Sequence, residues 1–87
     1  MRIVNARGMH ARAAARFVKL AETFAAEIDV VAGGVTVPGR SIMGLLMLAA
    51  GPGTEIELVA RGTDARDALD ALCRLVEAGF EEDDPAA

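Results

Sequence analysis

The sequence contains little cysteine, histidine or aromatic side chain. Cys73 is the single cysteine and His10 the single histidine of 87 residues, tryptophan and tyrosine are absent, and there are three phenylalanines. One cysteine cannot form an internal disulfide, which fits a reducing compartment, so we expect a cytoplasmic protein. One cysteine and one histidine do not supply a usual transition-metal ligand set, so we expect no metal and no other cofactor.

Long apolar runs are also absent. No stretch reaches the ~20 apolar residues of a membrane helix, so we expect no membrane insertion. Residues 1–10 contain Arg2, Asn5 and Arg7 instead of the apolar run of a secretory signal. The length suits one small domain, which we place at residues 1–80. Residues 81–87 begin with four acidic side chains, and we expect them to form a solvated, disordered tail.

The net charge of −4 hides an uneven distribution of charge. Residues 1–40 hold six basic and three acidic groups, whereas residues 41–80 hold three basic and six acidic groups. Positive charge is therefore concentrated in the half of the chain that contains His10. A basic face also suits nucleic acid, but the acidic balance of the chain and the lack of stacking aromatics argue against a nucleic-acid partner.

Apolar spacing and turn residues predict the order strand, helix, strand, strand, helix, strand, helix. Helices are expected at about 11–26, 41–50 and 65–78, and strands at 2–5, 28–32, 35–37 and 55–61. Gly33-Gly34 predicts a tight hairpin turn between two β-branched runs. Ser41 is the expected N-cap of the second helix, and Thr63 or Asp64 that of the third. The pattern is typical of an α+β fold in which an antiparallel sheet carries helices on one face.

The residues around His10 have the chemistry of an anion site. An apolar run, Gly8 and an alanine-rich helical run place His10 where a helix begins. The first turn of a helix has unpartnered backbone N–H groups and a partial positive charge. His10 with Arg12 close behind it therefore suits a phosphoryl group. From these residues alone, a surface histidine or a simple helix cap remains the alternative.

The expected helix at 41–50 is apolar on all sides. A helix this short in so small a domain cannot bury every face, so we expect part of it to form an exposed patch for a partner. Methionine suits such a patch because it adapts to different shapes. Complete burial of this helix is the alternative. The expected partner interface consists of Arg16, Ile42, Met43 and Leu46.

Two motifs resemble those of HPr, the histidine-containing phosphocarrier family of the bacterial phosphoenolpyruvate-dependent phosphotransferase system. Asn5-x-x-Gly8-Met9-His10-Ala11-Arg12 resembles the active-centre motif of the family, and Arg40-Ser41-Ile42-Met43-Gly44-Leu45-Leu46 resembles the motif around its regulatory serine. The order and separation of the motifs and the element order also match, so the resemblance covers residues 2 to about 80. It implies an open-faced β-sandwich, βαββαβα, with a four-stranded antiparallel sheet and three helices on one face.

The resemblance further implies phosphoryl relay. Enzyme I would phosphorylate His10 at Nδ1, and His10 would pass the group to IIA components of the sugar phosphotransferase system or of its nitrogen-related branch. Arg12 would pair with the phosphate, together with the backbone N–H groups of Ala11 and Arg12. Ser41 would be a regulatory phosphorylation site, which implies an HPr serine kinase/phosphorylase as a further partner. The family proline that follows the arginine is Ala13 here, which is compatible with the same helix start.

By this resemblance the chain is a carrier with a transient phosphohistidine and not a stand-alone enzyme. One alternative is a regulatory binding module of the same fold that performs no relay and docks through the helix at 41–50. Another is an enzyme with a histidine nucleophile. That enzyme would need a general acid–base pair near His10, and the chain has no second histidine to supply it.

Overall fold

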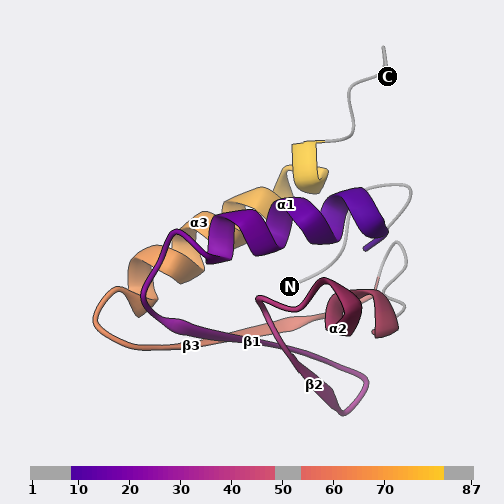
Figure 1. The fold of residues 1–87 in the computed structure, drawn as a ribbon, viewed down its shortest axis with the longest axis horizontal. Coiled ribbons are helices and arrows are strands. Elements are labelled where there is room, and N and C mark those ends of the chain that lie inside the picture. Colours follow the sequence, from indigo (N-terminus) through magenta and orange to yellow (C-terminus); the bar gives the residue numbers. More distant parts are fainter. Residues whose placement is uncertain (1–8, 49–53, 82–87) are drawn as a thin grey trace.

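The computed structural model describes residues 9–48 and 54–81, in which helices cover one face of an antiparallel sheet (Figure 1). The elements are α1 (Ala11–Ala21), β1 (Glu27–Ala32), β2 (Val35–Pro38), α2 (Ile42–Met47), β3 (Glu57–Arg61), α3 (Ala65–Glu77) and the 3-10 turn η1 (Gly79–Glu81). The predicted α+β class and one-sided packing are confirmed. The strand predicted at 2–5 lies outside the described residues, so the sheet that the structure describes has three strands where four were expected.

The sheet has the strand order β2-β1-β3, and both pairings are antiparallel. Gly33 and Gly34 join β1 to β2 with φ angles of 56° and 79°, which matches the tight turn expected from the sequence. Ala32 consequently pairs with Val35. On the other side of β1, Ile28 pairs with Ala60, so the two outer strands share β1 as their partner.

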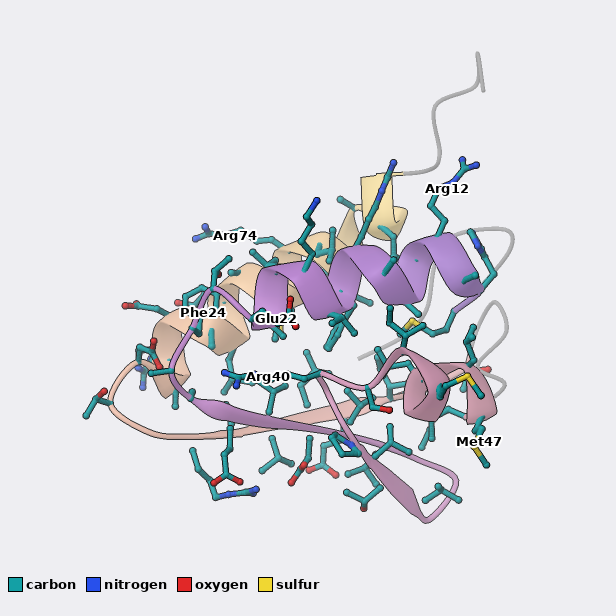
Figure 2. All side chains as sticks on the ribbon, viewed as in Figure 1. Arg12, Glu22, Phe24, Arg40, Met47 and Arg74 are labelled. Carbon is teal, nitrogen blue, oxygen red and sulfur yellow. The ribbon has the colours of Figure 1, made fainter. Side chains whose placement is uncertain are left out.

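Helix α1 ends at Ala21, so the prediction that it continues to about Ala26 was wrong. The backbone N–H groups of Ala25 and Ala26 both donate to the carboxylate of Asp64, at 2.8 Å each. The Arg40 guanidinium donates to the carbonyl oxygens of Phe24 and Ala26 from the turn before α2 (Figure 2). Apolar spacing alone did not reveal that side chains distant in the sequence hold this segment out of the helix.

Asp64 is the N-cap residue of α3, as expected, but its side chain makes no cap hydrogen bond. Its two oxygens are committed to the loop after α1. Asp64 is therefore at the predicted N-cap position, but the prediction that its side chain caps the helix was wrong. The carboxylate joins the end of α1 to the start of α3.

The core between the helices and the sheet is aliphatic and alanine-rich, as the composition predicts. Its largest fully buried side chains include Phe17 of α1, Leu45 of α2, Leu72 of α3 and Phe80 of η1. Phe80 is thus part of this core, and the domain range of 1–80 stays a prediction. Of the predicted tail at 81–87, residues 82–87 lie outside the described part of the chain. None of the helices described is both long and apolar enough to cross a membrane.

Candidate functional site

His10 is the N-cap of α1. Its backbone is extended, with φ −89° and ψ −177°, and its Nδ1 accepts a hydrogen bond from the backbone N–H of Arg12 at 3.1 Å. Because Nδ1 accepts this bond, the proton of the neutral imidazole is on Nε2. The side chain thus occupies the position where serine or aspartate usually caps a helix.

The two ring nitrogens of His10 lie in different surroundings. The hydrogen bond at Nδ1 is exposed, whereas Nε2 is buried. The preceding residue, Met9, is 4% exposed and anchors the chain to the core just before the histidine. This anchor and the cap bond fix the ring so that Nδ1, and not Nε2, meets the beginning of the helix.

The positive charge at this end of α1 comes from the backbone and from Arg12. The first turn of α1 contains no acidic residue, so its partial positive charge is not offset locally. Arg12 and Ala11 are exposed, and Figure 2 shows the Arg12 side chain extending outward from the helix. The structure therefore brings the backbone N–H of Arg12 to His10, whereas the guanidinium points toward solvent.

Arg16 lies one turn further along α1 and faces a different part of the molecule. It is half-buried, and its Nη1 donates a hydrogen bond to the carbonyl oxygen of Phe80 in η1. The structure consequently places Arg16 beside the last turn of the domain. Its expected place in a partner interface stays a prediction.

Ser41 caps α2, as expected, through a hydrogen bond from the Gly44 N–H to its Oγ at 2.9 Å. The helix continues to Met47, with Leu48 as its C-cap, and residues 49 and 50 of the predicted range lie outside the described residues. The serine is half-buried. Its hydroxyl is thus a structural cap as well as a candidate modification site.

The exposed part of α2 is apolar, and we call it the α2 patch: Ile42, Met43, Leu46 and Met47. Ile42, Met43 and Met47 are 41%, 69% and 78% exposed, and Leu46 is half-buried. Only Leu45 of α2 is buried, so the alternative of a completely buried helix was wrong. The interface predicted from the sequence did not include Met47, although its spacing of four residues from Met43 places both on one side of the helix.

The α2 patch lies near the beginning of α1. The two helices contact each other, and Figure 1 shows α2 below the end of α1 at which His10 stands. A half-buried histidine whose Nδ1 accepts an exposed hydrogen bond, a helix N-terminus and an apolar patch therefore occur in one region. A family model described as the phosphorylation site of the PTS HPr component matches residues 1–78.

The chain belongs to the HPr family. Among the HPr-family proteins it resembles, the phosphocarrier protein NPr of Shewanella violacea is 49% identical over 80 residues, which are 92% of this chain and 88% of that protein. The phosphocarrier protein HPr of Treponema pallidum is 43% identical over 83 residues, covering 95% and 94% of the two chains. A crystal structure of HPr from Thermoanaerobacter tengcongensis has a TM-score of 0.91 at 38% identity and covers 95% of this chain and 93% of that one.

Membership of the HPr family resolves the broad class of the protein. HPr-family proteins are phosphocarriers of the phosphotransferase system and not stand-alone enzymes. The alternative of an independent enzyme with a histidine nucleophile is thereby set aside. Among the described residues, no group of three or more histidine, cysteine, aspartate or glutamate side chains is placed to hold a metal ion.

Proposed function

We propose that this chain accepts a phosphoryl group from Enzyme I on Nδ1 of His10 and passes it to IIA components of the sugar phosphotransferase system or of its nitrogen-related branch. One observation carries the proposal: the 3.1 Å hydrogen bond from the Arg12 N–H to Nδ1. It directs the basic nitrogen of the neutral ring toward the helix N-terminus, where a phosphate is electrostatically favoured.

The transfer forms a P–N bond at His10 as the bond between phosphorus and the donor group of Enzyme I breaks. The lone pair of Nδ1 attacks phosphorus, and the electron pair of the broken bond stays on the donor group. The proton on Nε2 does not need to move. The Arg12 N–H, no longer bonded to the Nδ1 lone pair, can then donate to a phosphoryl oxygen, together with the N–H of Ala11.

The site binds phosphate with contacts suited to reversible transfer. An exposed helix-dipole interaction contributes about 0.3–1 kcal/mol, and the exposed Arg12 adds a charge-assisted contact when its side chain turns toward the phosphate. Stronger binding would stabilise the phosphorylated form and slow the second transfer. The exposed Nδ1 bond also leaves room for donor and acceptor proteins to approach in turn.

We further propose that Enzyme I and the IIA components dock on the α2 patch, and that phosphorylation of Ser41 by a serine kinase weakens this docking. The hydroxyl of Ser41 is next to Ile42 and caps the helix that carries the patch. A phosphate there adds nearly two negative charges beside apolar side chains, which raises the cost of covering them.

A regulatory module of the same fold that performs no relay is the second candidate. The exposure of Met43 and Met47, at 69% and 78%, favours a docking role for α2 in either case. The two candidates differ in one respect, because only the relay requires a phosphohistidine.

The test uses purified Enzyme I and radiolabelled phosphoenolpyruvate. We expect the wild-type chain to acquire an acid-labile phosphoryl group and to lose it to an added IIA component. His10→Asn is the matched variant, because its side-chain oxygen retains the N-cap acceptor but cannot form a phosphohistidine. Labelling of a folded His10→Asn chain would contradict the proposal, and an unlabelled wild-type chain would favour the regulatory module.

A further inference from the structure

A groove lies between α1 and α3 and is lined by residues of both. It consists of two adjoining hollows of about 610 and 290 Å³. Leu20 and Leu75 line both, so the hollows form one continuous trough. The larger hollow is lined by Arg16, Lys19, Leu20, Thr23 and Leu75. The smaller is lined by Leu20, Ala71, Arg74, Leu75 and Ala78.

The floor of this α1–α3 groove is apolar and its two sides are basic. Leu20 and Leu75 form the centre of the floor. Lys19 stands on the α1 side with Arg16, and Arg74 stands on the α3 side, where Figure 2 shows it extending outward from the helix. These cations are concentrated in one place although the whole chain has a net charge of −4.

Lys19 and Arg74, the exposed cations of the groove, form no ion pair with another described residue. Across residues 9–48 and 54–81, the ion pairs are those of Arg61 with Glu27 and Asp29, on the sheet. Lys19 and Arg74 are exposed and take part in neither. Two exposed cations on opposite sides of an apolar trough favour a ligand that combines negative charge with an apolar surface.

We propose that the α1–α3 groove binds an acidic amphipathic helix of a partner protein. The groove extends from Arg16 of α1 to Thr23 in the turn after it, and from Ala71 of α3 to its C-cap Ala78, which is about 10 Å, or two helical turns, on each side. An apolar stripe of two turns on the partner helix covers the floor, and carboxylates beside the stripe meet Lys19 on one side and Arg74 on the other. A small anion would leave the floor uncovered, and a neutral apolar ligand would leave both cations without a partner.

This surface is separate from the one proposed for relay. Helix α1 contacts both α2 and α3, and the residues that line the groove include neither His10 nor any member of the α2 patch. A partner helix in the groove therefore leaves Nδ1 of His10 and the α2 patch accessible. We expect such a partner to bind whether or not the chain is phosphorylated, as a sensor or scaffold of the carrier would.

The test measures NMR shifts of the ¹⁵N-labelled full chain as a synthetic peptide is added. The peptide has about 15 residues, the length at which an isolated helix becomes stable in water. It carries a leucine stripe with glutamate on both sides, and a second peptide has lysine in place of glutamate. We expect the acidic peptide to shift the amides of Lys19, Leu20, Arg74 and Leu75, and the basic peptide to leave them unchanged.

Three charge reversals supply the controls. Lys19→Glu and Arg74→Glu should each raise the Kd of the acidic peptide about fivefold to tenfold, because each reversal removes the attraction of an exposed charge pair and adds a repulsion of similar size. Arg66→Glu makes the same change in net charge at an exposed α3 position outside the groove, and should have little effect. Equal weakening by Arg66→Glu, equal binding of the basic peptide, or shifts confined to the α2 patch would each overturn the proposal. So would binding of phosphatidylglycerol vesicles, but not of the peptide, with the same dependence on Lys19 and Arg74.

Discussion

The guanidinium of Arg16 donates a hydrogen bond to the carbonyl oxygen of Phe80, 64 residues later in the chain. Phe80 is completely buried, and its φ of 56° lies in the left-handed region that residues with a side chain rarely adopt. Such a conformation persists only when surrounding contacts enforce it. The bond from Arg16 and the burial of the ring therefore act together to close the domain.

Replacing Arg16 should lower stability. We expect Arg16→Gln to reduce the free energy of unfolding by about 1–3 kcal/mol, because the Phe80 carbonyl loses a charge-assisted hydrogen bond. Lys19→Gln, at an exposed position of the same helix, should change it by less than about 0.5 kcal/mol. Urea unfolding measures both. If the Arg16→Gln chain kept full stability and only had a higher KM as a substrate of Enzyme I, the partner-interface role predicted from the sequence would explain Arg16 better.

Replacing Asp64 should loosen the segment after α1. Asp64→Ala removes the acceptor of two hydrogen bonds, from Ala25 and Ala26, and we expect a loss of about 2–3 kcal/mol. Asp64→Asn retains one side-chain oxygen and should be intermediate. Hydrogen exchange of the Ala25 and Ala26 amides reports the local effect. Unchanged protection of these two amides in Asp64→Ala would show that the loop is held by other contacts.

Substitutions of Ser41 should separate capping from docking. Ser41→Ala loses the acceptor for the Gly44 N–H and should cost about 0.5–2 kcal/mol of stability. Ser41→Asp keeps an acceptor and places a negative charge at the helix N-terminus, so stability should be retained. The same charge lies beside Ile42 and Met43, where docking of Enzyme I would remove it from water. A desolvation cost of ~1.4 kcal/mol would slow phosphoryl transfer from Enzyme I about tenfold. Phosphorylation of Ser41→Asp at the wild-type rate would count against the proposed regulation.

Cys73 should react slowly with alkylating agents. Partial burial raises the pKa of its thiol, and the negative charge of Glu77 raises it further. Because the folded pKa is above the unfolded one, the unfolded chain loses this proton first as the pH rises. Ionisation of this thiol therefore leaves the free energy of unfolding unchanged below the usual thiol pKa of about 8.5. Above that pH the free energy of unfolding falls as the pH rises.

Mass spectrometry of iodoacetamide-treated protein checks this behaviour of Cys73. At pH 8 the folded chain should be alkylated several-fold more slowly than the chain in urea, since the thiolate is the reactive form. Glu77→Gln should raise the rate for the folded chain modestly. Equal rates with and without urea would show that neither burial nor charge protects the thiol.

The features predicted correctly from the sequence are those set by neighbouring residues. Gly33-Gly34 forms a turn because both positions need positive φ, and Ser41 caps α2 because its side chain reaches the backbone of the next turn. His10 stands at the predicted helix start, and its cap bond corresponds to the alternative that the sequence left open. The wrong boundary of α1 has a non-local cause, namely the bonds from residues 25 and 26 to Asp64. The position of Arg16 depends in the same way on the approach of η1, which no local pattern encodes.

At the site itself, the sequence predicted which kinds of residue come together better than it predicted the directions of their side chains. The sequence placed His10 at a helix start and an apolar patch on α2, and both are observed. It did not reveal that the backbone N–H of Arg12, and not its guanidinium, contacts the ring, because side-chain direction depends on packing and solvent. It also did not predict the groove between α1 and α3, which exists only when residues distant in the sequence are packed together.

The most direct test of the account is the position of the phosphoryl group on the His10 ring. After incubation with Enzyme I and phosphoenolpyruvate, ¹H–¹⁵N and ³¹P NMR distinguish phosphorylation at Nδ1 from phosphorylation at Nε2. We predict a single phosphohistidine substituted at Nδ1, with a large shift of the Arg12 amide as its hydrogen bond moves from the ring to a phosphoryl oxygen. Substitution at Nε2, or an Arg12 amide that does not respond, would contradict the account.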